Sequence, residues 1–125
     1  MDFLSIFNDK FGELLRDLKV IFGDDGDLTL LSAGFLFATA ASKDGAWRVF
    51  HDQVAVPYGP RVMERDERFF LEFEDLKEAN AIDIMGRVRG AWKDLSPENR
   101  NVIWDYFTLL VKLSDRVAVQ MKARA

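Results

Sequence analysis

The sequence has no cysteine and only one histidine, His51, in 125 residues. The lack of cysteine excludes disulfides, cysteine nucleophiles, iron–sulfur clusters and thiolate zinc sites. A single histidine also leaves no second imidazole to complete a metal site. We therefore expect neither a metal nor a cofactor.

Long apolar runs and targeting signals are also missing. The longest uncharged run, residues 28–42, contains serine, threonine and glycine. It is shorter than the roughly twenty apolar residues of a membrane span. The residues after Met1 do not form a basic segment followed by an apolar one, as a secretory signal does. The sequence thus predicts a soluble, intracellular protein with no membrane span and no secretion signal.

The composition is that of a folded protein: 49% of the residues are hydrophobic and 30% are charged. A chain of this length fits one compact domain over residues 1–125, with much of the core supplied by eleven phenylalanines and three tryptophans. The net charge of −4 argues against nucleic acid or anionic lipid as a partner.

Apolar residues recur at spacings of three and four along most of the chain, which is typical of amphipathic helices. We expect helices over 2–22, 27–42, 44–55, 76–95 and from Ser96 to the end of the chain. Gly23 ends the first helix, and Ser96-Pro97-Glu98 begins the last with a cap, a proline and an acid. No segment alternates as a strand would. The pattern predicts an all-α, irregular bundle of four to five main helices plus short helical turns.

The segment Val56-Pro57-Tyr58-Gly59-Pro60 is expected to interrupt the third helix. Proline disfavours helix in the residue before it, and glycine permits an unusual turn. Pro60 would then begin a short helix through Arg65. On this interpretation, the segment is a structural corner or a corner that binds a partner.

Two patterns could carry chemistry. His51 could act as a general base with Asp52 or another nearby acid, although a partly exposed helix residue is the simpler interpretation. Residues 64–78 carry seven acids and three bases, a net charge of −4, which favours an acidic docking surface over a catalytic pair. The common nucleotide-binding, zinc-protease and kinase motifs are absent from the sequence.

A basic strip near two tryptophans suggests a second class of function. A helix and its neighbour could align Arg87, Arg89, Lys93 and Arg100 beside Trp92 and Trp104. Basic and aromatic side chains together bind single-stranded nucleic acids. However, tryptophan at helical spacing is usually part of a core, and the acidic net charge opposes nucleic-acid binding.

Several stretches resemble one protein family. They are residues 49–59, with Val54, Pro57, Tyr58 and Gly59; residues 64–71, ending in Phe69-Phe70-Leu71; and residues 101–107, around Trp104. Together with the Phe- and Leu-rich segment 3–22, they resemble short, uncharacterised helical proteins encoded by large DNA viruses of algae and protists. The resemblance implies a viral or virus-like origin and a place in the host cell or the virion, and it implies no activity.

The leading hypothesis is a non-enzymatic interaction or structural module that presents a helical face to a protein partner. The candidate contact residues are aromatic and lie among charges: Tyr58, Phe69, Phe70 and Phe73. Their alternative role is to cap the core. A homodimer through the apolar last helix is a variant of the hypothesis, and the alternatives are a nucleic-acid-associated protein and a small helical enzyme that uses His51.

Overall fold

The computed structural model describes residues 2–23, 39, 41–71 and 90–124, including every side chain in these ranges except those of residues 70, 71 and 124. All regular elements of this part of the chain are helical, which confirms the all-α class. They are α1 (Phe3–Phe22), α3 (Gly45–Phe50), the π-helix η1 (His51–Ala55), α4 (Val56–Met63), α5 (Arg68–Leu71), the 3-10 helix η2 (Trp92–Asp94) and α7 (Pro97–Arg124).

These elements form three long helical bodies, because α3, η1 and α4 follow one another without a gap. That number is below the four to five main helices predicted. The helices predicted over 27–42 and 76–95 lie almost entirely outside the described residues. No helix in the described ranges has the length and apolar character needed to cross a membrane.

Helix α1 begins and ends where the sequence predicts. The side chain of Asp2 accepts a hydrogen bond from the backbone N–H of Ser5 at 3.1 Å, which satisfies a free donor of the first turn. Gly23 follows the helix with φ of 79°, a conformation that suits glycine. The predicted apolar face is confirmed, since its central members are fully buried: Phe7, Leu14, Leu15 and Leu18.

Helix α7 confirms the predicted start signal. The hydroxyl of Ser96 accepts a hydrogen bond from the N–H of Asn99 at 3.1 Å, and Pro97 is the first helical residue. With 28 residues the helix is about 42 Å long, so it can pack against several other elements at once. Its inner stripe is buried at Ile103, Phe107, Leu110, Leu113 and Val117.

The predicted break at residues 56–60 is wrong, because the chain continues as a helix through this segment. Val56, which precedes Pro57, has the helical angles φ −67° and ψ −53°, and Pro60 lies inside α4. The preference against helix before proline is a local one, and packing outweighs it here. Val54 and Val62 are buried in a body that contacts α7 on both sides of the prolines.

The π-helix η1 lies directly before the first proline. Within it the N–H of Val56 bonds to the carbonyl of His51, five residues back. This wider turn stands where the helix has to accommodate Pro57, which has no N–H and whose ring crowds the preceding turn. Gly59 does not form a turn either. It faces α7, and a Cβ atom there would lie 3.7 Å from Cγ1 of Val111.

Helix α4 ends in a Schellman motif that has arginine where glycine is usual. The N–H of Asp66 bonds to the carbonyl of Arg61, and that of Arg65 bonds to Val62, both at 3.0 Å. Arg65 has φ of 54°, the left-handed region that costs a side-chain-bearing residue energy. Its guanidinium lies 2.5 Å from Asp105 of α7, so an ion pair accompanies the strained backbone.

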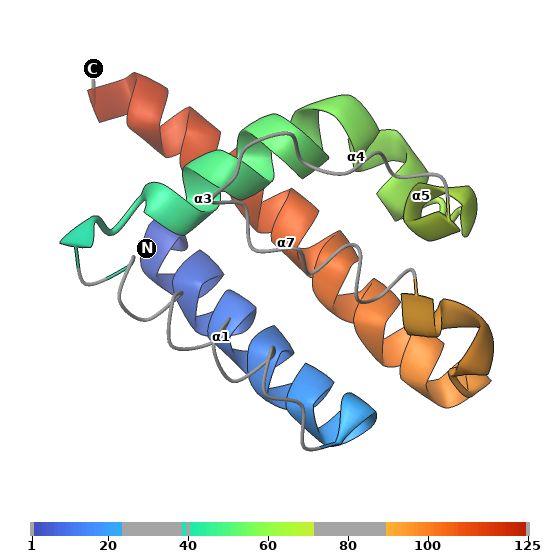
Figure 1. Ribbon diagram of the computed structural model, residues 1–125. Coiled ribbons are helices and arrows are strands. Elements are labelled where there is room, and N and C mark those ends of the chain that lie inside the picture. The colour runs from blue at the N-terminus through green and yellow to red at the C-terminus, as the bar shows by residue number, and fades with distance from the viewer. Residues whose placement is uncertain (1, 24–38, 40, 72–89, 125) are drawn as a thin grey trace.

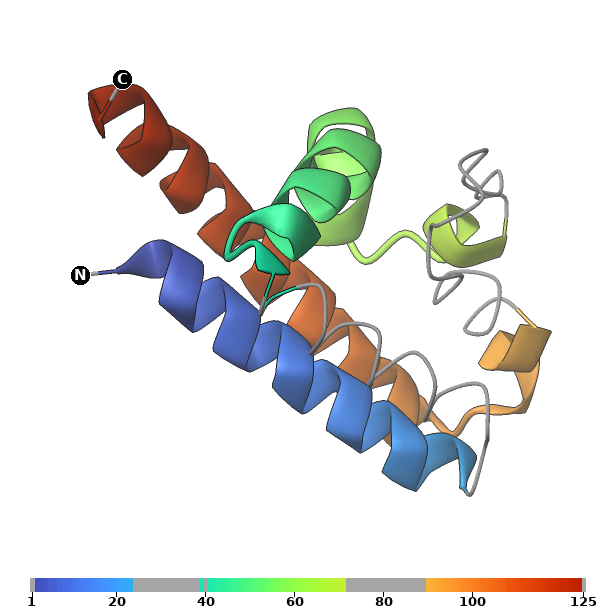
Figure 2. The same cartoon turned by 60° about the vertical axis from the view of Figure 1, so that its left-hand side comes forward.

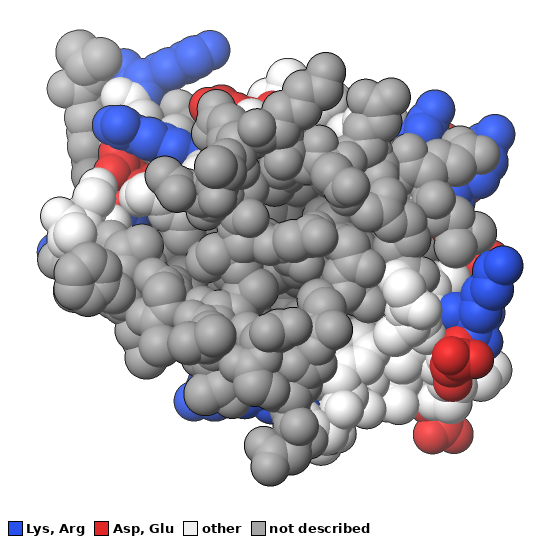
Figure 3. Space-filling model, viewed as in Figure 1, with Lys and Arg blue, Asp and Glu red and all other residues white. Residues whose placement is uncertain are grey.

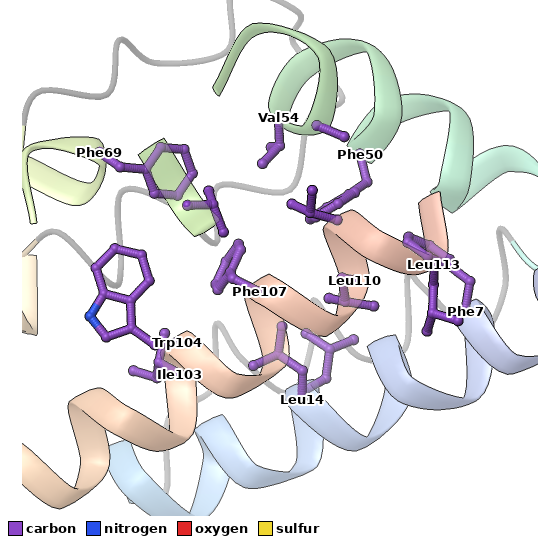
Figure 4. Packing of buried hydrophobic residues seen from close by; sticks show 14 of the residues in the cluster. Phe7, Leu14, Phe50, Val54, Phe69, Ile103, Trp104, Phe107, Leu110 and Leu113 are labelled. Carbon is purple, nitrogen blue, oxygen red and sulfur yellow. The ribbon is translucent and has the colours of Figure 1, made fainter. Parts of the chain in front are cut away.

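The three bodies enclose one aromatic core. Helices α1 and α7 run antiparallel side by side, and the α3–η1–α4 body lies across α7 (Figures 1 and 2). Phe50 contacts Phe7 and Phe107, with ring centroids 5.5 and 6.3 Å apart. Phe107 also contacts Phe69 at 6.0 Å. Figure 4 shows Phe107 on α7 between Phe69 and Phe50, so this ring joins α7 to α3 and α5, while Phe50 joins α3 to α1.

Candidate functional site

Two side chains of the α3–η1–α4 body, those of Trp47 and His51, contact the same serine of α7 and stack on each other. The Nδ1 atom of His51 lies 2.7 Å from the hydroxyl oxygen of Ser114. The indole N–H of Trp47 donates to the backbone carbonyl of the same serine at 3.1 Å. The rings of Trp47 and His51 stack with centroids 5.3 Å apart and planes at 27°. Both contacts therefore attach the first turns of the α3–η1–α4 body to Ser114 of α7.

This arrangement does not support the enzyme alternative. A histidine at hydrogen-bond distance from a serine has the spacing of a base and a nucleophile. However, Ser114 has 0% exposure, so no substrate can reach its hydroxyl. Asp52, the acid predicted to assist His51, is exposed on the outer side of the helix. Within the described ranges, no three His, Cys, Asp or Glu side chains come together as metal ligands.

The apolar periodicity of the last helix marks Ser114 as a buried polar residue in the sequence itself. The residue lies four positions after Leu110 and three before Val117, which places it on the buried stripe of the last helix. A polar side chain on such a stripe requires a partner inside the protein. That partner is His51.

The structure places two of the four predicted contact aromatics against the core. Phe69 is 1% exposed and packs on Phe107. Tyr58 is half-buried, and its ring lies on that of Phe69 with centroids 5.5 Å apart. Phe69 is therefore a core residue, as the alternative interpretation of this group had it. The side chain of Phe70 and all of Phe73 lie outside the described part of the structure.

The apolar stripe of the last helix, for which a homodimer was one hypothesis, is buried in the core of the chain itself. It packs against α1 and the α3–η1–α4 body, with Phe107, Leu110 and Val117 buried. A homodimer through this stripe would require the core to open. The exposed side of α7 instead carries charges such as Lys112 and Asp115.

The basic strip is only partly within the described residues. Arg87 and Arg89 lie outside them, and Lys93 is exposed. Arg100 folds back over the preceding turn, with its guanidinium 5.4 Å from the centre of the Trp92 ring.

The polar contacts of Arg100 are internal as well. It donates to the carbonyls of Trp92 and Lys93 at 3.1 and 3.2 Å, and it forms an ion pair with Glu67 at 3.3 Å. Arg100 thus stabilises η2 and is not a free cation. In the view of Figure 3, acidic and basic side chains lie beside one another at the right-hand edge.

The groups with shifted pKa values also take part in contacts that hold the fold together. Burial, followed by the hydrogen bond that its hydroxyl donates to Asp17, raises the pKa of Tyr106 to about 12. This contact joins α7 to α1. A hydrogen bond from Ser42 lowers the pKa of Asp44, and bonds from Arg68 lower the pKa of Asp66.

Apolar side chains gather on the outer side of the α3–η1–α4 body. Val49, Val56, Pro60 and Met63, which we call the outer ridge, all point away from the core and are exposed. Val56 is 66% exposed, Val49 48% and Met63 42%. The opposite side of the same body is buried at Phe50, Val54, Ala55, Gly59 and Val62.

The outer ridge could not be predicted while a break was expected at Val56. Once α4 is continuous, Val56, Pro60 and Met63 share one side of it through spacings of four and three, and Val49 lies on the same body before the π turn. That spacing is the signal that the sequence contained.

Comparisons with known proteins add no assignment: no family model matches the sequence, and no curated protein or solved structure is significantly similar to it.

Proposed function

We propose that this chain is a non-enzymatic helical module that binds a protein partner through the outer ridge. The single observation that carries the proposal is the gathering of exposed apolar side chains there. In the described part of the structure six large hydrophobic residues are exposed, and three of them, Val49, Val56 and Met63, lie on this one helical body. Two exposed prolines, Pro57 and Pro60, enlarge the apolar surface.

The groups suited to chemistry have structural roles, which supports a binding function over a catalytic one. His51 fastens η1 to α7, Arg100 stabilises η2, and Tyr106 joins α7 to α1. Apolar helix faces of this kind dock against a second apolar surface. Complete burial of a valine or methionine side chain contributes about 1.5–3 kcal/mol of free energy. Val56 is 66% exposed and Met63 42%, so binding a partner can still bury a large part of each side chain.

We further propose that the module acts inside a host cell or as a component of a virion. The support is the resemblance of residues 49–59, 64–71 and 101–107 to the helical proteins of large DNA viruses. Because Phe69 lies in the core, the outer ridge and not the aromatic residues among charges carries the binding proposal.

Site-specific photo-cross-linking tests this proposal in an extract of algal or protist host cells. A photoreactive amino acid replaces Val56 in one variant and Val119 in a control, since both valines are 66% exposed and lie on different elements. We expect an adduct of discrete mass from position 56, none from position 119, and loss of the adduct when Met63→Glu is added. The same set of products from both positions, or no product from position 56, would refute the proposal.

A further inference from the structure

The two prolines beside the outer ridge leave two backbone carbonyls without a helical donor. A helix carbonyl accepts from the N–H four residues on, or five residues on in a π turn. The N–H of Val56 bonds to the carbonyl of His51. Because Pro57 has no N–H, the carbonyl of Asp52 finds a donor neither four nor five residues on. The carbonyl of Val56 loses its donor to Pro60, which lies inside α4.

These carbonyls lie on the solvent side of the body, since Asp52 and Val56 are both exposed. The side chain of Asp52 adds a full negative charge one turn before Val56. Within the described ranges, no lysine or arginine forms an ion pair with this carboxylate, and Arg48, one turn before it, is bound to Asp44 at 2.7 Å. Unpaired helix carbonyls carry partial negative charge. This part of the ridge therefore presents only acceptors, next to apolar side chains.

We infer that the outer ridge binds an arginine side chain of its protein partner. The inference rests on the proposed function, because it names the group with which the partner binds the same surface. The guanidinium donates to the carboxylate of Asp52 and to the carbonyls of Asp52 and Val56. Apolar side chains beside that arginine pack on Val56, Pro60 and Met63. The partner segment is thus one that carries arginine among apolar residues.

The spacing of the acceptors favours arginine over lysine. Asp52 and Val56 lie one turn apart, about 5–6 Å along the axis. A guanidinium has five N–H groups on three nitrogens and no acceptor, so it can donate to a carboxylate and to a carbonyl at the same time. An ammonium has its donors on one nitrogen and is more strongly hydrated, so it loses more on contact with an apolar surface.

Side-chain analogues test this inference on the purified full chain. The protein, labelled with ¹³C and ¹⁵N, is titrated at constant ionic strength with n-propylguanidinium, which represents arginine, or with n-butylammonium, which represents lysine. The carbonyl ¹³C shifts report donation to each backbone oxygen. Asp115 is the matched control, because it is exposed on α7 and no proline follows it in that helix.

Two variants assign the response to its acceptors. Asp52→Asn should weaken the binding of n-propylguanidinium about fivefold, the difference between a charge-assisted and a neutral hydrogen bond. Pro60→Ala gives the carbonyl of Val56 an N–H donor, so the response of Val56 should disappear while that of Asp52 remains. Circular dichroism should show that both variants keep the helicity of the parent.

The inference predicts that n-propylguanidinium shifts the carbonyl carbons of Asp52 and Val56 in a saturable way and that n-butylammonium shifts them much less. Equal shifts with the two cations, equal shifts at Asp52 and Asp115, or unchanged binding in Asp52→Asn would overturn it. If the analogue does not bind but position 56 still captures a host protein, the arginine contact is refuted and the binding function stands. If the analogue binds as predicted but position 56 captures nothing, the proposed function fails and the acceptor site stands.

Discussion

Replacing two glycines by alanine should have very different effects on stability. Gly59 lies inside α4 without a positive φ, and its new Cβ would be in ordinary contact, 3.7 Å from Val111. Glycine within a helix is less stable than alanine by about 0.5–1 kcal/mol, because alanine loses less backbone entropy on folding. Gly59 also precedes Pro60, however, and the proline ring crowds a Cβ at this position. The two effects oppose each other, so Gly59→Ala should leave the free energy of unfolding within about 1 kcal/mol of the parent value.

Gly23→Ala is the matched comparison. Nothing lies within 4 Å of a Cβ at this position, so a steric clash with other residues cannot contribute. The backbone, however, has φ of 79° and ψ of −158°, a region almost restricted to glycine. We expect a loss of about 1–3 kcal/mol for alanine there.

Urea and thermal unfolding, followed by circular dichroism, measure both effects. A change of 1 kcal/mol corresponds to roughly 3–6 °C in Tm for a chain of this size. If residues 56–60 formed a turn that required a positive φ at Gly59, Gly59→Ala would cost as much as Gly23→Ala. Equal losses at the two positions would refute the helical course of α4.

Three further substitutions test single contacts. Ser114→Ala should lower the free energy of unfolding by about 1 kcal/mol in urea. A double-mutant cycle with His51→Ala should return a coupling of similar size, and no coupling would contradict the contact. Arg65→Gly should leave a protein about 1 kcal/mol more stable than Arg65→Ala, because only glycine relieves the positive φ, and equal stabilities would count against that strain. Tyr106→Phe should cost about 1–2 kcal/mol at pH 7 through the lost bond to Asp17. Native Tyr106 keeps its proton up to about pH 12, whereas the unfolded chain releases it near pH 10. The native state thus binds more protons in this window, so stability should fall as the pH rises from 10 to 12. Urea unfolding at successive pH values should show this loss in the parent protein and a smaller one in Tyr106→Phe, and the same loss in both would contradict the shift.

The ends of the chain could be predicted because their signals are local. The spacing of Phe7, Leu14 and Leu18 defines a helix face without reference to other elements, and the Ser96-Pro97 pair marks a helix start by its own chemistry. Both helices form as predicted, and the same side chains are buried.

The middle of the chain could not be predicted, because its local signals are outweighed by packing. Pro57 and Gly59 favour a turn by themselves, but the buried Val54 and Val62 hold this body against α7. The π turn before Pro57 makes the continuation possible, and no sequence signal announces it.

The wrong prediction of a break at residues 56–60 also affected the prediction of the contact surface. Tyr58 and Phe69 were candidate contact residues, with a place at the core as the alternative. They pack on each other, and Phe69 is buried in the core. The outer ridge became visible only when Val49, Val56 and Met63 were seen to share one helix.

The proposed binding function therefore depends on the helical course of residues 45–63, which backbone chemical shifts measure directly. The Cα shifts of the labelled 14.4 kDa protein should deviate from random-coil values in the helical direction without interruption from Gly45 through Met63. Random-coil or extended shifts at Val56 to Gly59 would contradict the structure, and with it the outer ridge.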